Sequence, residues 1–203
     1  MATLSTTTKL DAVNTILIGI GEAPVNTLGS GLQEAEIAEV VLDNINREVQ
    51  SKGWTFNTDL RISLVKNLEG FINLPTDCLK VDTTTLLRDY DTDVVERNRR
   101  LYDRVTNSYI FTKDLIVDMV ILLPFEGLPE VARRYITLRA GRKYQENVIG
   151  SQTLSQLQAD EEGLALIALQ EEEASVGDYN IFDHYDTYRH LDRNISTASS
   201  TLI

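Results

Sequence analysis

The sequence predicts an α+β fold: a mainly antiparallel four-helix bundle with an inserted antiparallel β region between helices two and three, and an extended C-terminal tail. Apolar residues recur at helical spacing before residue 53 and again after residue 129. Between them, short apolar runs are broken by turn residues, with no helical crossover. The predicted domains are residues 1–53 with 124–177 for the helices, 54–123 for the β region and 178–203 for the tail.

Composition narrows the possible functions. The 203 residues carry a formal net charge of −12, which disfavours non-specific binding of nucleic acid, because such binding needs a dense positive surface. A single cysteine, Cys78, excludes an internal disulfide and a multi-cysteine zinc site. No apolar run reaches the ~20 residues that span a bilayer. The first residues lack the features of an export signal, so we expect synthesis in the cytoplasm and no membrane contact.

The first helix is predicted over residues 8–20, with Thr8 and Asp11 as a capping pair and Gly21 as its end. The second is predicted over residues 31–52, capped by Ser30 with Gln33 and ended by Gly53. Its apolar face is predicted to consist of Ile37, Val41, Ile45 and Val49, joined by Val40 and Leu42.

Gly53 and the residues after it form a structural junction where the helical period ends. Trp54, the single tryptophan, is expected to pack the base of the β region against the helices, with Phe56 beside it. The runs that follow are predicted as strands over residues 54–58, 62–65, 71–74, 79–81, 84–87, 101–105, 109–112 and 114–123.

The third helix is predicted from Pro129 to about residue 148 and the fourth over residues 153–174. The apolar side of the fourth is predicted to hold Leu154, Leu157, Leu164, Ile167 and Ala168.

These two helices carry opposite charges. The third holds Arg133, Arg134, Arg139, Arg142 and Lys143; the fourth holds Asp160, Glu161, Glu162, Glu171, Glu172 and Glu173. The charges either form solvated faces, pair within one chain, or meet between subunits. In the third case, contact between two different patches of the same protein is a head-to-tail contact, and repetition of it can close a ring of subunits. On the third alternative the candidate interface residues are Arg133, Arg134, Arg139, Glu171 and Glu172.

The tail segment combines aromatic residues with possible metal ligands. Asp178, Asp183, His184, Asp186 and His190 are conceivable ligands for a divalent ion. The same segment holds Tyr179, Phe182, Tyr185 and Tyr188, which are typical anchors of a protein contact. The pattern favours the contact.

Motifs for catalysis are weak. Residues 89–93 begin like a calcium loop but lack its glycine, and the basic cluster at residues 96–100 lacks the aromatic residues of a nucleic-acid site. No catalytic residue, metal site or cofactor is predicted. A glycoside hydrolase stays an alternative, since carboxylates are abundant and their pairing depends on their separation in space.

Several segments resemble the tail tubular protein A family, the head-to-tail adaptors or gatekeepers of T7-like short-tailed phages. They are residues 21–28 (GEAPVNTL), 45–47 (INR), 53–57 (GWTFN), 101–104 (LYDR), 128–130 (LPE) and 179–180 (YN). Their order and spacing agree along nearly the whole chain, most weakly in the middle of the β region and at the end.

This resemblance implies a structural virion protein of the tail's neck region, not an enzyme. It implies a twelve-fold homo-oligomeric ring between the portal and the nozzle (tail tubular protein B), with fibres nearby and genomic DNA passing through the lumen on ejection. An acidic lumen would keep DNA mobile. The alternative class is a carbohydrate hydrolase that acts on host surface polysaccharide during infection.

Overall fold

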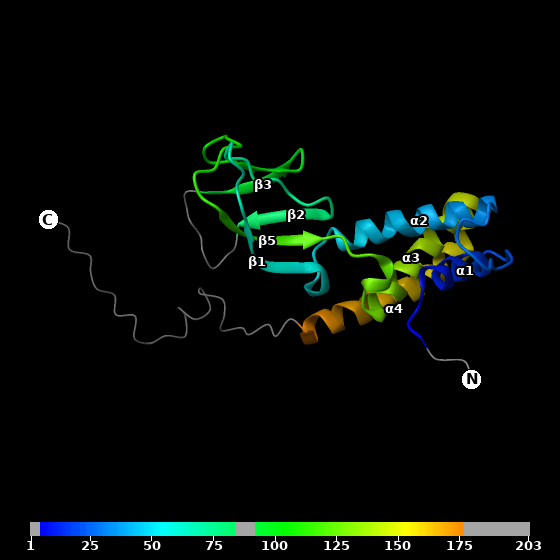
Figure 1. Cartoon of the computed structure of the whole chain (residues 1–203). Helices are drawn as coiled ribbons and strands as arrows, with labels where there is room; N and C mark the ends of the chain where they lie inside the picture. Colours follow the sequence, from blue (N-terminus) through cyan, green and yellow to red (C-terminus); the bar gives the residue numbers. More distant parts are fainter. Residues whose placement is uncertain (1–4, 84–91, 177–203) are drawn as a thin grey trace, which may run out of the picture.

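The computed structural model describes residues 5–83 and 92–176. Its helices are α1 (Lys9–Gly19), α2 (Gln33–Gln50), α3 (Glu130–Val148) and α4 (Gln152–Val176). The strands are β1 (Thr58–Leu64), β2 (Cys78–Thr83), β3 (Val94–Arg97), β4 (Arg100–Asp103) and β5 (Leu115–Ile121), and 3-10 turns lie at η1 (Thr55–Asn57) and η3 (Phe125–Gly127). Helices and sheets occupy opposite ends of the molecule (Figure 1). No described helix is both long and apolar enough to cross a membrane.

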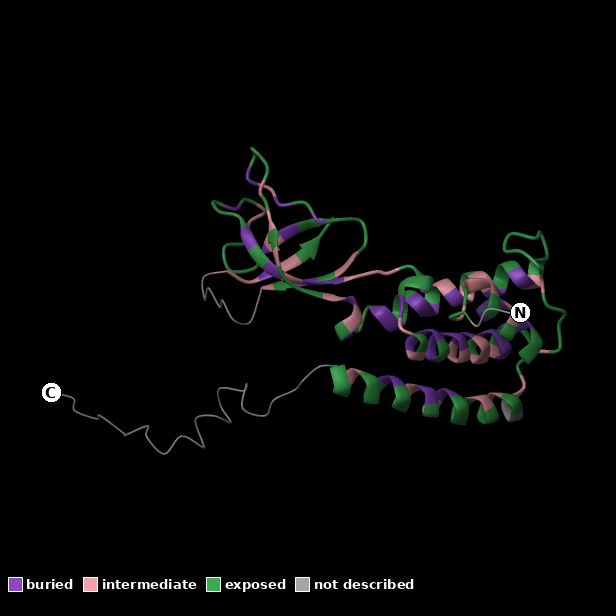
Figure 2. Cartoon of the chain, turned by 60° about the horizontal axis from the view of Figure 1, so that its bottom comes forward, coloured by how far each residue is buried: buried purple, intermediate pink, exposed green. Residues whose placement is uncertain are grey.

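The described strands form two antiparallel sheets, one with the order β1-β5-β2 and the other a β3-β4 hairpin. The fold is therefore α+β, with four helices and two sheets in these ranges. The prediction of a mainly four-helix bundle with an inserted β region is wrong. In such a bundle each helix packs against two neighbours around one core. Here α3 packs against α1, α2 and α4, whereas α4 lies against α3 (Figure 2). The sheets have a hydrophobic core of their own around Ile72, Leu101 and Val117.

The cap of α1 is formed by residues close together in sequence and was predictable. The Thr8 hydroxyl accepts from the backbone N–H of Asp11 at 3.2 Å, and the Asp11 carboxylate accepts from the backbone N–H of Thr8 at 3.0 Å. This confirms the predicted capping pair. The box predicted at Ser30 and Gln33 is wrong, because α2 begins at Gln33 and its N-cap, Leu32, makes no side-chain hydrogen bond.

The buried face of α2 is set by small residues. Leu42, Ile45 and Val49 are buried as predicted, but Ala35 and Ala38 complete the face, with spacings of three and four residues. Alanine lets α2 approach its neighbours closely. The predicted positions Ile37 and Val40 are instead 39% and 59% exposed.

The predicted apolar side of α4 is also wrong. Its buried residues are Glu162, Ala165 and Leu169. All five residues predicted to face inward are exposed: Leu154, Leu157, Leu164, Ile167 and Ala168.

Only part of the predicted strand pattern is confirmed. Strands are found near the predicted residues 62–65, 79–81, 101–105 and 114–123. Of the strand predicted at 54–58, residues 55–57 instead form the 3-10 turn η1. Residues 71–74 and 109–112 do not belong to either sheet. The predicted strand at 84–87 lies outside the described residues, as does the calcium-like loop up to residue 91.

The corrected face of α2 can be tested by truncation. We expect Leu42→Ala to lower the free energy of unfolding by about 2–5 kcal/mol, because it opens a cavity in the core. Val40→Ala is the matched control and should change it by less than about 0.5 kcal/mol, because Val40 is on the surface. Equal losses in urea titrations of the two variants would contradict this face.

Cys78 in β2 should be a slow nucleophile. Burial raises the pKa of its thiol to about 11, and the negative charges of Glu96 and Asp77 add to the effect. At pH 8 a much smaller fraction of Cys78 than of an ordinary cysteine is ionised to the thiolate. We therefore expect its alkylation to be on the order of a hundredfold slower than that of a free thiol. The rate should recover in denaturant and rise with pH up to the raised pKa. Equal rates in folded and unfolded protein would refute the shift.

Candidate functional site

The chain crosses twice between helices and sheets, and the two crossings lie together. One crossing leads from the end of α2 to β1, and the other leads from β5 to η3 and α3 (Figure 1). We call these two segments, residues 49–58 and 120–125, the joint. Any fixed arrangement of the sheets relative to the helices depends on it.

Gly53 opens the joint because only glycine fits comfortably there. Its φ of +78° lies in the left-handed region, where a side chain is strained. A Cβ at this position would also lie 3.0 Å from Cγ2 of Val120 on the returning strand. The backbone of the first crossing therefore packs directly on β5.

Trp54 anchors the same crossing to the helices. Its side chain is buried, and its indole Nε1–H donates to the backbone carbonyl of Val49 at 2.8 Å. The Phe56 ring stacks near it, with ring centroids 6.3 Å apart. Trp54 belongs to the hydrophobic core of the helices, and its packing against the base of the β region stays a prediction.

Two buried amide side chains connect the crossings. Gln50, fully buried in α2, donates from Nε2 to the carbonyl of Leu123 at 2.9 Å and accepts the Leu123 N–H on Oε1 at 2.8 Å. Asn57 donates from Nδ2 to the carbonyls of Gln50 and Ile121, at 3.0 and 2.9 Å. Its Oδ1 accepts the Trp54 N–H at 2.8 Å.

The side chains of Gln50 and Asn57 are buried, and their polar atoms are paired with backbone groups of the two crossings. An unsatisfied buried N–H or C=O costs about 1–3 kcal/mol. Sequence reasoning missed Gln50 and Asn57. For Gln50 a signal existed, since Asn46 and Gln50 are four residues apart on the buried side of α2. A polar side chain in that position needs a hydrogen-bond partner. Gln50 Nε2 also donates to Asn46 Oδ1 at 2.9 Å.

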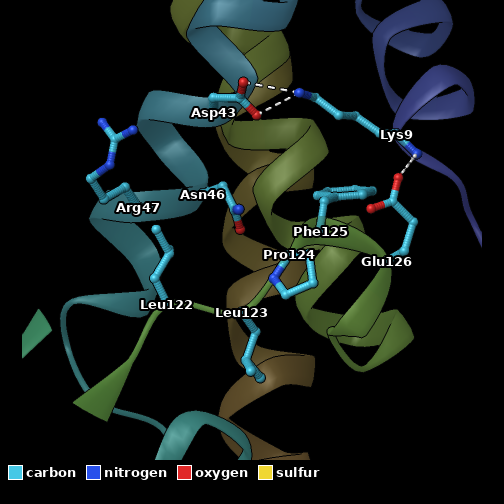
Figure 3. A pocket seen from close by; sticks show the side chains of 9 residues that line it. All are labelled: Lys9, Asp43, Asn46, Arg47, Leu122, Leu123, Pro124, Phe125 and Glu126. Carbon is cyan, nitrogen blue, oxygen red and sulfur yellow. Dashed lines mark hydrogen bonds and ion pairs between the residues drawn. The ribbon is translucent and has the colours of Figure 1, made fainter. Parts of the chain in front are cut away.

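A pocket of about 330 Å³ lies beside the joint, between α1, α2 and the segment entering η3 (Figure 3). Lys9 spans it and binds the carboxylates of Asp43 and Glu39, each at 2.9 Å. Burial lowers the pKa of Lys9, but hydrogen bonds and charge from Asp43 and Glu39 outweigh it, so the pKa rises above its usual value. The Glu126 carboxylate accepts the backbone N–H of Lys9 at 3.3 Å.

This pocket offers little to a hydrolase. Glycoside hydrolysis uses a pair of carboxyl groups that face the substrate, one of them as a proton donor. Here Asp43 is ion-paired and Glu126 accepts a backbone hydrogen bond, so both carboxylates support local structure. Their neighbours Leu122, Leu123 and Pro124 belong to the returning crossing.

Opposite charges of α3 and α4 meet inside the chain. Glu162, whose side chain is 9% exposed, binds Arg139 Nη1 at 3.1 Å and also Nε of Arg142. Arg139 reaches Glu48 of α2 at 2.5 Å through Nη2. Arg139 thus joins α2 to α4 through ion pairs within one chain.

The remaining predicted interface residues divide into three groups. Arg133 is buried and donates to the carbonyls of Leu128, Thr7 and Glu126. Arg134, Glu171 and Glu172 are exposed, and the part of the chain that the structure describes offers none of them an ion-pair partner. The four tail aromatics lie outside the described residues: Tyr179, Phe182, Tyr185 and Tyr188.

Known proteins resemble this chain along most of its length. A family model for tail tubular protein matches residues 10–179. The chain is also similar to tail tubular protein A of Klebsiella phage KP34, at 29% identity over 128 residues. That stretch covers 63% of this chain and 66% of the relative.

The bridging role of Gln50 predicts a large effect from one substitution. Gln50→Leu keeps the volume but leaves the Leu123 N–H and C=O without their partner, so we expect a loss of about 2–3 kcal/mol in the free energy of unfolding. Gln170→Leu on the exposed side of α4 is the matched control, with less than about 0.5 kcal/mol. If calorimetry gave the same stability for both variants, Gln50 would not hold the joint.

Proposed function

Because this chain belongs to the tail tubular protein family, we propose that its copies form a twelve-fold ring that joins the portal to the tail nozzle. Family membership makes the chain a structural component of a phage tail. The proposal adds the adaptor position at the neck, the nozzle protein tail tubular protein B as a partner, fibres as possible neighbours, and a lumen through which the genome is ejected.

The observation that carries the proposal is the family match over residues 10–179, which spans both the helices and the sheets. Two physical features support it. The joint gives each copy a fixed arrangement of sheets and helices, and a ring of identical copies requires identical angles. The net charge of −12 suits a lumen wall along which DNA must move without binding.

Each part of the chain has a place in this proposal. The helices, in residues 1–53 and 124–177, form the ring, because their exposed apolar and charged faces are free to meet other copies. Residues 54–123, with their separate hydrophobic core, form a unit that projects from it. Residues 178–203 reach to neighbouring tail proteins through Tyr179, Phe182, Tyr185 and Tyr188. Arg134, Glu171 and Glu172 are the predicted charges that remain available for contacts.

The direct test mixes the full chain with the portal protein of its own phage and examines the product by electron microscopy. We expect rings attached to the portal. The complex of portal and ring should then bind the nozzle protein. A chain that stayed monomeric with portal present, and was absent from virions, would overturn the proposal. Steep salt-dependent affinity for duplex DNA would favour a DNA-binding role instead.

The role of the joint is tested by Trp54→Ala. Removing a buried tryptophan should cost about 3–5 kcal/mol and loosen the sheets, so we expect fewer rings on the portal and a lower particle yield. Trp54→Phe is the control, because it retains much of the packing while it removes the hydrogen bond to Val49. Normal rings and particle yield from Trp54→Ala would show that assembly does not need this anchor.

A further inference from the structure

The β3–β4 hairpin carries three arginines that the proposed function does not use. Arg97 and Arg100 are directly opposite each other across the two strands, and Arg99 lies in the two-residue turn between them. All three are exposed, and within the described residues none of them has an ion-pair partner. We call these three arginines, together with the rings of Tyr102 and Phe71, the hairpin tip. In a chain with a net charge of −12, it is a concentrated positive surface.

Aromatic rings hold two of the guanidinium groups in place. The guanidinium carbon of Arg97 lies 3.8 Å from the ring centroid of Tyr102, and that of Arg100 lies 4.9 Å from the ring centroid of Phe71. The Tyr109 ring meets Tyr102 edge to face, with centroids 4.9 Å apart. A guanidinium that lies over a ring keeps the N–H donors at its edge free for an anion. The sequence interpretation of this basic cluster missed these rings because they lie outside the run of charges.

The hairpin tip contains two features that are unfavourable on their own. Arg97 and Arg100 place like charges directly opposite each other on antiparallel strands. In the turn, Asn98 and Arg99 have φ values of +55° and +58°, and glycine is the preferred residue at the second of these positions. The Glu96 carboxylate offsets part of this cost by accepting the backbone N–H of Arg99 at 3.0 Å. An anion bound between the guanidinium groups would relieve the repulsion that remains.

Exposed apolar side chains flank the positive charge. Ile110 is 61% exposed and lies against Gly70, where a Cβ would be 2.9 Å from its Cγ2. Phe71, the next residue, carries the guanidinium of Arg100, and Leu68 is exposed in the preceding turn. Protein interfaces are enriched in arginine and aromatic residues and depleted in lysine, and the hairpin tip has three arginines and no lysine. The composition is therefore that of a protein contact.

The number of charges disfavours duplex DNA as the partner. Proteins that bind duplex DNA tightly neutralise about 6–10 phosphates with lysine and arginine. The hairpin tip supplies three arginines, and the whole chain holds 31 acidic against 19 basic residues, which repel a polyanion. A small group of carboxylates needs less charge, because one arginine can bind one carboxylate through two parallel hydrogen bonds.

We propose that the hairpin tip binds an acidic segment of another protein of the tail, in which carboxylates stand beside aromatic or other apolar residues. The guanidinium groups of Arg97, Arg99 and Arg100 bind the carboxylates, while Leu68 and Ile110 contact the apolar side chains. This contact goes beyond the proposed ring and does not depend on it.

The chemistry is tested with a fluorescently labelled random copolymer of glutamate and tyrosine, titrated with the full chain and followed by anisotropy. We expect Arg97→Gln and Arg99→Gln each to weaken binding at least about fivefold, because each removes charge-assisted hydrogen bonds. Arg61→Gln is the matched control, since Arg61 is an exposed arginine elsewhere in the β region, and it should leave binding unchanged. Equal effects of the three variants, or no binding of the copolymer, would overturn the proposal.

Two further measurements separate carboxylate recognition from general attraction to a polyanion. Arg100→Lys retains the charge but loses the planar fork and the ring contact, so its affinity for the copolymer should fall about as far as that of Arg100→Gln. Duplex DNA at the same concentration of negative charge should bind more weakly than the copolymer. Tighter binding of the DNA, which would indicate a nucleic-acid site, or full affinity in the lysine variant would contradict the proposal.

The partner is sought in assembled phage particles by photo-crosslinking. We place p-benzoylphenylalanine at Tyr109, beside the hairpin tip, and at Leu60 of β1, which is 68% exposed, as the control. Illumination should link residue 109 to an acidic segment of another tail protein, identified by mass spectrometry. Links only to DNA or to copies of this chain, links to segments without an excess of acidic residues, or links no stronger than those of the control would each overturn the proposal.

Discussion

The hydrogen bonds of Gln50 are the constraint on which the arrangement of the molecule depends. This side chain extends from α2 and binds both the N–H and the C=O of Leu123, where the chain returns from the sheets. Asn57 completes the connection by binding the carbonyls of Gln50 and Ile121. Because the side chains of Gln50 and Asn57 are buried, their polar atoms need partners within the protein. The end of α2, the start of β1 and the approach to α3 are therefore fixed together.

A second constraint acts through charge. Glu162 is buried under α4 and held by Arg139 and Arg142, and Arg139 also reaches Glu48 of α2. This cluster decides which side of α4 faces the protein, and it places Leu164 in solvent. Internal ion pairs thus leave apolar side chains of α4 exposed on the surface of the chain. The joint and the cluster together fix how the helices and the sheets are arranged within one chain.

The sequence predicted features that depend on neighbouring residues. The Thr8 and Asp11 cap and the positive φ of Gly53, shortly after the end of α2, follow from local backbone chemistry. The inward face of α2 was predicted only in part, at Leu42, Ile45 and Val49, and that of α4 was not predicted correctly, because the largest apolar residues were assumed to be buried. Close packing favoured Ala38 in α2, and ion pairing favoured Glu162 in α4. At the joint, Trp54 was found from its size, whereas Gln50 was missed because its partner Leu123 is distant in sequence.

The joint also determines how the molecule responds to mechanical load. Any force that draws the sheets from the helices is carried by the two crossings of the joint, residues 49–58 and 120–125. The bonds of Gln50 and Asn57 tie these crossings to each other. Bending or twisting the sheets against the helices would move one crossing past the other and would therefore have to break these bonds. The connection therefore resists bending and twisting, while pulling is carried by the backbone of the two crossings.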